Sequence, residues 1–160
     1  MISEETPPPY LREDEVRQGI ELLFYAYRDF TAEPDAMLAR YGFGRAHHRV
    51  IYFVGRHPHM SVSELLGILR ITKQSLSRVL GQLVDQGFIQ QRTGKADRRQ
   101  RLLELTAKGI DLERQLSENQ RQRIARAYAE AGPQAVEGFR KVMLGIISAD
   151  TDRARFRRSR

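Results

Sequence analysis

The chain has 160 residues, no cysteine and a formal net charge of +7, which fits one small domain with helical extensions. The absence of cysteine excludes disulfides, thiolate metal ligands and thiol-based redox sensing. No apolar run approaches the roughly 18 residues of a membrane span, and the first residues lack the pattern of a signal peptide. We therefore expect a cytoplasmic protein without a membrane partner.

Charge is distributed unevenly along the chain. Residues 43–105 hold 11 Lys and Arg against 4 Asp and Glu, whereas residues 1–42 hold 4 against 9. The last ten residues hold 5 against 1. A basic block of this kind favours a polyanionic partner, because cations placed on phosphates release condensed counterions. A basic solvated face that aids solubility explains the same charge equally well.

The first half of the chain is predicted to be helical. Residues 1–10, with three consecutive prolines, indicate a disordered or polyproline-type arm. Apolar residues recur at three- and four-residue steps from Leu11 to Phe30 and predict an amphipathic helix. Pro34 then either starts a second short helix or kinks the first. The next predicted helix covers residues 45–56 and stops before a proline.

Two shorter helices and a hairpin follow. Ser61 and Glu64 form a capping-box pattern at the start of one helix, and Thr72 caps the next. The periodicity then changes, and residues 88–92 and 101–105 predict two strands joined by a polar, basic turn.

The last third is again predicted to be helical. Thr106 caps a long amphipathic helix, Gly132-Pro133 breaks it, and a final helix covers about residues 134–147. Residues 153–160 form a short basic tail, which could either be disordered or bind flanking DNA.

The order helix, tight turn, helix, hairpin within residues 61–105 is that of a winged helix-turn-helix. With its apolar residues in a core, the second helix presents side chains that suit base edges and phosphates. A merely solvated helix face is the alternative, but no acidic residue interrupts this face before Asp85. The predicted DNA-contacting residues of this helix are Lys73, Gln74, Ser75, Ser77, Arg78 and Gln82.

The hairpin tip is a second predicted DNA-contacting element, since a basic wing can reach a minor groove or the backbone. By itself a basic hairpin is ordinary surface, and its position after the helix pair gives it significance. Asp97 would repel phosphates, so we expect it to orient a neighbouring arginine. The basic residues of the wing are Lys95, Arg98, Arg99 and Arg101.

Several of these segments together resemble the MarR family of bacterial transcriptional regulators. The resemblance is carried by Ser61-Val62-Ser63-Glu64-Leu65, Leu76-Ser77-Arg78, Gly87-Phe88-Ile89, Asp97-Arg98-Arg99 and Leu105-Thr106-Ala107-Lys108-Gly109. It implies a homodimer with interwoven terminal helices on a palindromic double-stranded DNA operator. It also implies Arg99 as the minor-groove arginine with Asp97 in support. The peroxide-sensing mechanism of the family needs cysteine and is excluded here.

Relatives of this kind often bind aromatic acids or phenols near the junction of helices and wing, so the resemblance suggests a small aromatic or anionic effector. Tyr25, Arg28 and Arg49 are the candidate pocket residues. Core or dimer packing explains the aromatic stripe as well, and pairing with Asp29 or Glu33 explains the arginines.

Metal and enzyme chemistry find little support. Four histidines lie between His47 and His59, but no carboxylate stands at a ligand spacing from them, so we expect no metal and no other cofactor. We find no phosphate-binding loop, dinucleotide fingerprint or nucleophile elbow, and we expect a protein that is not an enzyme.

The predicted fold is mainly α with a small β-hairpin wing. We expect a disordered arm (1–10), N-terminal dimerisation helices (11–44), a winged helix-turn-helix (45–105), C-terminal dimerisation helices (106–150) and a basic tail (151–160). The predicted function is that of a dimeric, sequence-specific DNA-binding regulator, a repressor released by a small ligand. The alternative is a non-specific architectural or protein-interaction module that uses the same fold.

Overall fold

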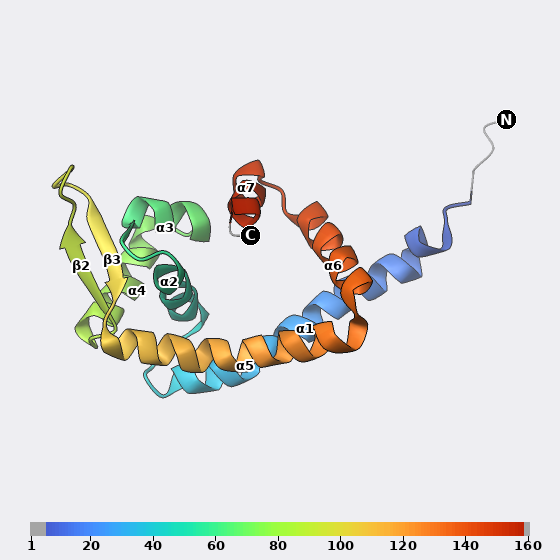
Figure 1. Ribbon diagram of the computed structural model, residues 1–160, viewed down its shortest axis with the longest axis horizontal. Coiled ribbons are helices and arrows are strands. Elements are labelled where there is room, and N and C mark those ends of the chain that lie inside the picture. Colours follow the sequence, from blue (N-terminus) through green and yellow to red (C-terminus); the bar gives the residue numbers. More distant parts are fainter. Residues whose placement is uncertain (1–5, 159–160) are drawn as a thin grey trace.

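The computed structural model describes residues 6–158 and is mainly helical, with one small sheet (Figure 1). This confirms the predicted fold class. In chain order the elements are a 3-10 turn (Pro9–Leu11), α1 (Glu13–Ala39), α2 (Arg45–Arg56), β1 (Met60–Ser61), α3 (Val62–Leu69), α4 (Lys73–Asp85), β2 (Ile89–Thr93), β3 (Arg101–Leu105), α5 (Ala107–Ala131), α6 (Pro133–Ile146) and α7 (Asp150–Arg158).

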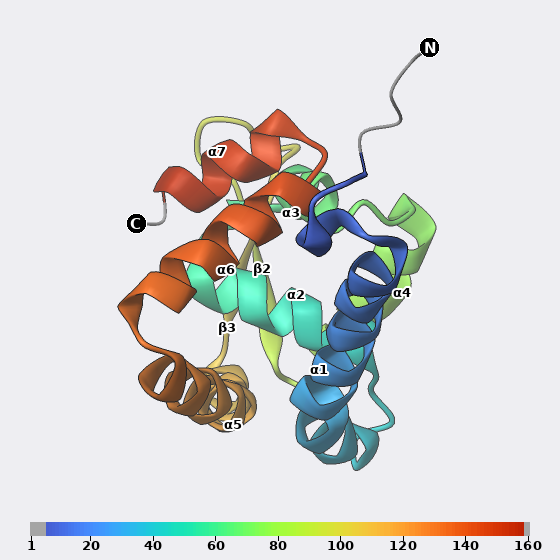
Figure 2. The same ribbon diagram turned by 90° about the vertical axis from the view of Figure 1, so that its right-hand side faces the viewer.

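One end of the molecule is the winged region, which is formed by the elements from α2 to β3. The helical arms, α1 and α6, extend towards the other end (Figure 1). Helices α2, α3 and α4 gather around the sheet, and α5 runs from the base of the sheet towards α6. Seen along the molecule, α1 and α6 stand on opposite sides of α2 (Figure 2). The first five residues of the predicted disordered arm lie outside the described part, and residues 9–11 form the 3-10 turn.

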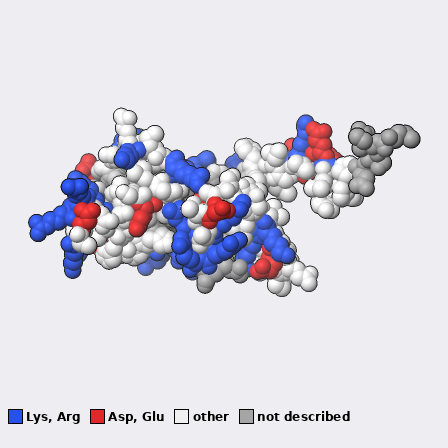
Figure 3. Space-filling model, turned by 90° about the horizontal axis from the view of Figure 1, so that it is seen from above, with Lys and Arg blue, Asp and Glu red and all other residues white. Residues whose placement is uncertain are grey.

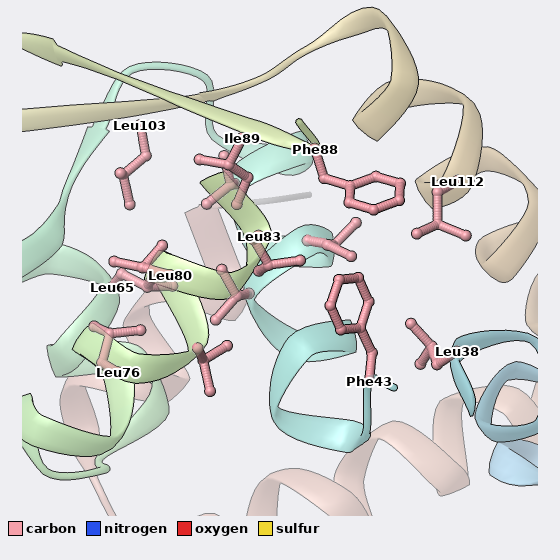
Figure 4. Close-up of a cluster of buried hydrophobic side chains, with 14 of the residues drawn as sticks. Leu38, Phe43, Leu65, Leu76, Leu80, Leu83, Phe88, Ile89, Leu103 and Leu112 are labelled. Carbon is pink, nitrogen blue, oxygen red and sulfur yellow. The ribbon is translucent and has the colours of Figure 1, made fainter. Parts of the chain in front are cut away.

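The hydrophobic core lies entirely between Leu38 and Leu116 in the sequence. It joins α2, α3, α4, the sheet and the start of α5 (Figure 4). The side chains that are at most 3% exposed include Val50, Ile51, Val54, Leu65, Leu76, Val79, Leu80, Leu83, Phe88, Ile89 and Leu103.

The predicted helix starts are confirmed by their hydrogen bonds. Ser61 Oγ accepts from the Glu64 N–H at 3.1 Å, and a Glu64 carboxylate oxygen accepts from the Ser61 N–H at 3.2 Å. Thr106 Oγ1 accepts from the Gly109 N–H at 3.1 Å. A Cβ on Gly109 would lie 2.1 Å from the Phe88 carbonyl oxygen, so only glycine allows α5 to start against the sheet.

Pro34 neither starts a helix nor ends one: α1 continues through it. Proline has no N–H, so the carbonyl of Phe30, four residues earlier, loses its helical donor. The Gln120 side chain of α5 donates to that carbonyl at 3.2 Å instead. This tertiary hydrogen bond explains how one helix spans a position where the sequence predicts a break or kink.

Two elements were not predicted from the sequence. Strand β1 pairs antiparallel with β3 through Met60 and Leu103, so the sheet has the order β1-β3-β2. The C-terminal segment forms the helix α7 over residues 150–158, so the described part of the basic tail is helical, and residues 159–160 lie outside the described range.

The arms contrast with the winged region. Helix α6 has no buried residue, and in α1 the buried residues are confined to Thr31, Pro34 and Leu38 at its C-terminal end. Within residues 6–158, no helix is long and apolar enough to cross a membrane. Large apolar side chains stand exposed on both arm helices: Val16, Ile20, Leu23, Phe24, Tyr27, Phe139, Val142 and Ile146.

Candidate nucleic-acid interface

Helix α4 is fixed by its buried face and its N-cap. The side chain of Thr72 accepts from the Ser75 N–H at 3.1 Å, which satisfies a free donor of the first turn. The opposite face of α4 begins with two basic and two neutral polar side chains. Four of the predicted DNA-contacting residues are exposed there: Lys73, Gln74, Ser77 and Arg78.

The other two predicted residues of α4 are engaged within the protein. The hydroxyl of Ser75 accepts from that of Thr72 at 2.9 Å. Gln82 is half-buried, and its Oε1 lies 2.6 Å from Nε2 of His47. Because Nδ1 of His47 accepts from the Gly44 N–H at 3.0 Å, Nε2 carries the proton and donates to Gln82. The structure therefore places Gln82 against α2 rather than with the exposed row.

The wing tip is a tight turn closed by three hydrogen bonds. Asp97 accepts through its carboxylate from the Arg99 N–H at 2.9 Å and through its carbonyl from the Gln100 N–H at 3.1 Å. The Gly94 N–H donates to the Gln100 carbonyl at 2.9 Å. A Cβ on Gly94 would lie 2.7 Å from the Asp97 carbonyl oxygen. Asp97 thus holds the main chain of Arg99, whereas the sequence predicted a contact that orients an arginine.

The base of the wing is cross-linked by polar contacts, whereas its tip is not. Arg101 donates to the Gln91 amide oxygen at 3.0 Å, and Arg92 pairs with Glu104 at 2.8 Å. By contrast, the tip cations form no ion pair with any residue in the described range. These exposed, unpaired side chains are Lys95, Arg98 and Arg99.

A groove of about 690 Å³ joins α3, α4 and the wing. Its lining includes Lys73 and Ser77 from α4 and Asp97, Arg99 and Arg101 from the wing. The structure therefore brings residues from both predicted elements to one surface. Lys and Arg side chains gather at this wing end of the molecule when it is viewed from above (Figure 3).

Gln91 also lines this groove and was not predicted. It pairs in register with Leu103, so both side chains stand on the same face of the sheet. A polar residue at an inward-facing strand position was the signal that could have identified it.

The three candidate effector residues are not brought together in a cavity. The Arg28 guanidinium lies 4.9 Å from the centre of the Tyr25 ring and pairs with Asp29 at 3.0 Å, all on α1. Arg49 of α2 donates to the Tyr27 hydroxyl at 2.9 Å. Neither the groove at α4 nor a smaller one of about 280 Å³ beside Gly55 is lined by any of the three.

The histidines make separate contacts. In the part of the chain that the structure describes, no three His, Asp or Glu side chains gather as a metal site would require. Burial lowers the pKa of His48 below its usual 6.5, and Arg49 acts in the same direction, while Asp35 and Glu113 partly oppose the shift. His59 lies 3.3 Å from Glu104.

Comparison with known proteins relates this arrangement to a family. The family model that matches residues 41–100 is that of the MarR family. The HTH-type transcriptional regulator PetP of Rhodobacter capsulatus is 52% identical over 138 residues, which cover 86% of this chain and 83% of PetP.

Solved structures share the fold at lower identity. The crystal structure of MarR aligns with a TM-score of 0.63 at 17% identity and covers 98% of this chain and 100% of that one. The crystal structure of Streptococcus pneumoniae FabT in complex with DNA aligns with a TM-score of 0.71 at 18% identity and covers 82% of this chain and 94% of FabT. The sequence match to PetP and the matching family model show that the chain belongs to the MarR family of winged helix-turn-helix transcriptional regulators, and it is not an enzyme.

Proposed function

We propose that the protein is a dimeric, sequence-specific DNA-binding regulator that inserts α4 into the major groove and the wing into the adjacent minor groove. The observation that carries this proposal is the groove that joins the exposed row of α4 to the wing. Lys73 and Ser77 of that row and Arg99 of the wing line the groove, so groups that suit phosphates come from both elements to one surface. The shared fold of FabT, whose structure is a complex with DNA, supports this assignment.

In this proposal, Arg78 and Gln74 read bases, because a recognition helix contacts base edges through its N-terminal half. Lys73 and Ser77 bind phosphates, and Arg99 enters the minor groove from the turn that Asp97 closes. We retain residues 45–105 as the DNA-binding domain, flanked by dimerisation helices over 11–44 and 106–150.

The second copy is proposed from the exposed apolar side chains of α1 and α6. An uncovered stripe of this size is unfavourable in water, and two interwoven chains would bury it. A two-fold dimer would present two α4 helices to half-sites one DNA turn apart, which predicts a palindromic operator.

The regulatory part of the proposal is repression relieved by a small ligand. An aromatic or anionic ligand at the junction of α1 and α2 would compete with the Tyr27 hydroxyl for Arg49. A ligand that favours one arrangement of these helices changes the distance between the two α4 helices. At the wrong distance the dimer cannot occupy both half-sites, and affinity falls.

The test is fluorescence anisotropy of the full chain with the DNA upstream of its own gene and with a scrambled duplex. We expect binding that distinguishes the two duplexes. Arg78→Ala should reduce that discrimination by about 1–3 kcal/mol. Lys95→Ala should lower the affinity for both duplexes equally and lower the salt dependence of binding. Equal affinity for both duplexes, or a monomer at micromolar concentration, would contradict the proposal and favour an architectural module.

A further inference from the structure

Helix α7 is an element to which neither the family assignment nor the proposed function gives a role. It follows α6, yet the chain reverses so that α7 lies beside α3 of the winged region (Figures 1 and 2). Seen from above, the Lys and Arg side chains over α7 form a second gathering beside the one at the wing (Figure 3).

Contacts on two sides hold α7 in this position. Asp152 accepts from Arg70, the residue that ends α3, at 3.3 Å. The Arg155 guanidinium lies 3.4 Å from where a Cβ on Gly67 of α3 would stand, so the missing side chain leaves room for it. On the other side, the Arg153 guanidinium donates to the carbonyls of Leu144 at 3.2 Å and Ile147 at 2.5 Å. These carbonyls belong to the end of α6, where helical donors are missing.

Both acidic side chains of α7 form ion pairs. Asp150 pairs with Arg153 at 3.2 Å, and Asp152 pairs with Arg155 at 3.0 Å as well as with Arg70. The last two described residues, Arg157 and Arg158, are exposed and form no ion pair within residues 6–158. The acidic start of α7 therefore anchors the helix, and its far end carries uncompensated positive charge.

We propose that α7 is a second DNA-contacting element, which places Arg157 and Arg158 on phosphates next to the half-site bound by α4. This inference rests on the proposed DNA binding and adds a contact to it. Arginine in this position acts through charge and has no base edge to read, so its contribution is independent of sequence. Asp152 and Arg153 are positioning residues, since they act through the placement of the helix.

The test compares this 160-residue chain with its Arg157→Gln/Arg158→Gln variant on the upstream duplex and on a scrambled duplex. Each duplex has about 40 bp, which is enough for two half-sites one turn apart. Affinity is measured from about 50 to 200 mM KCl, because the slope of log K against log salt counts phosphate contacts at about 0.9 each. We expect the slope to fall by about 3.6 for a dimer that loses four contacts. The affinity for both duplexes should fall by the same factor.

Two further variants distinguish a phosphate contact of α7 from a general loss of positive charge and from a displaced helix. Arg40→Gln/Arg114→Gln removes the same charge from exposed positions just after α1 and on α5, outside α7, and should leave the slope nearly unchanged. Asp152→Ala removes a negative charge, so electrostatics alone would tighten binding. If Asp152 holds α7 in place, binding weakens instead, and circular dichroism shows whether the helix content is kept.

The outcomes are distinguishable. A wild-type slope and affinity for Arg157→Gln/Arg158→Gln would overturn the role of α7 while DNA binding itself stands. A loss of discrimination with an unchanged slope would also overturn it, because α7 would then act by positioning α3 and α4. If the wild-type protein binds neither duplex, the proposed function fails and this inference fails with it.

Discussion

The winged region and the arms differ in how each satisfies its apolar side chains. Every buried hydrophobic residue in the described range lies between Leu38 and Leu116, so the winged region encloses its own core. The N-terminal two-thirds of α1 and the whole of α6 bury nothing within one chain. The same protein therefore contains one part that can fold by itself and another that lacks a hydrophobic interior until something covers it.

This difference predicts how the stability of each region depends on protein concentration. Core packing in the winged region stabilises α4 and the wing irrespective of concentration, whereas in the proposed dimer the order of the arms would depend on association and hence on protein concentration. Substitutions in the two regions should therefore differ in how their effects depend on protein concentration.

The largest effect is expected from a charge on the exposed stripe of the arms. Ile20→Glu would place two unpaired carboxylates in the proposed dimer interface, at about 2 kcal/mol each. We expect the dimer to dissociate about a thousandfold more readily, as measured by analytical ultracentrifugation. Gln18→Glu adds the same charge on another face of α1 and should remain dimeric. A dimer that tolerates Ile20→Glu would show that this stripe is not the interface.

A cavity in the winged core should have the next largest effect. Leu83 is fully buried, so Leu83→Ala removes packed methyl groups and should lower the free energy of unfolding by about 3 kcal/mol. Thermal unfolding should show the same loss at low and high protein concentration. Val84→Ala, at a position 36% exposed on α4, is the matched control within the same region and should cost little. A concentration-dependent loss for Leu83→Ala would erase the contrast between the two regions.

The wing tip lies outside the core, and its order depends on local hydrogen bonds. Asp97→Ala removes the acceptor for the Arg99 N–H, worth about 1 kcal/mol. We expect about fivefold weaker DNA binding for each wing, or about 25-fold for the dimer, in the anisotropy titration. Asp97→Asn keeps an acceptor and loses the negative charge, so it should bind at least as tightly as the wild type. If both variants behave alike, the turn does not depend on this contact.

The smallest effect is a dependence of stability on pH. Because burial lowers the pKa of His48 in the folded state, the unfolded chain takes up its proton first as pH falls below about 6.5. Stability from this group is complete above that pH and is lost towards the lower folded-state pKa. His48→Gln should reduce the fall in melting temperature over this pH range. His57→Gln, at an exposed position, should leave that fall unchanged. A wild-type profile for His48→Gln would assign the decline to other groups.

Periodicity and capping residues were sufficient to predict the helices and the hairpin of the winged region. Ser61, Thr72 and Thr106 cap helices because their hydroxyls act within three residues along the chain. The exposed row of α4 followed from the same periodicity, since four of its six predicted residues face solvent.

Features that depend on contacts between distant segments could not be predicted in this way. Gln82 meets His47 across 35 positions, which removes it from the exposed row. Strand β1 exists only because β3 lies beside it, and a two-residue strand has no periodicity of its own. Helix α7 is held by Arg70 from α3 and by carbonyls at the end of α6, so its charge pattern alone gave no indication of its place.

The hydrogen bond from Gln120 to the Phe30 carbonyl has a mechanical consequence. It replaces the helical hydrogen bond that Pro34 removes, and it ties α1 to α5 at that level. The part of α1 before Pro34 is about 30 Å long at 1.5 Å per residue. It is therefore a lever arm: a bend of about 10° at its base would move its far end by about 5 Å. The Gln120 amide is thus one of the contacts, together with the Asn119 amide that donates to Glu33, that resist bending of α1 at its base.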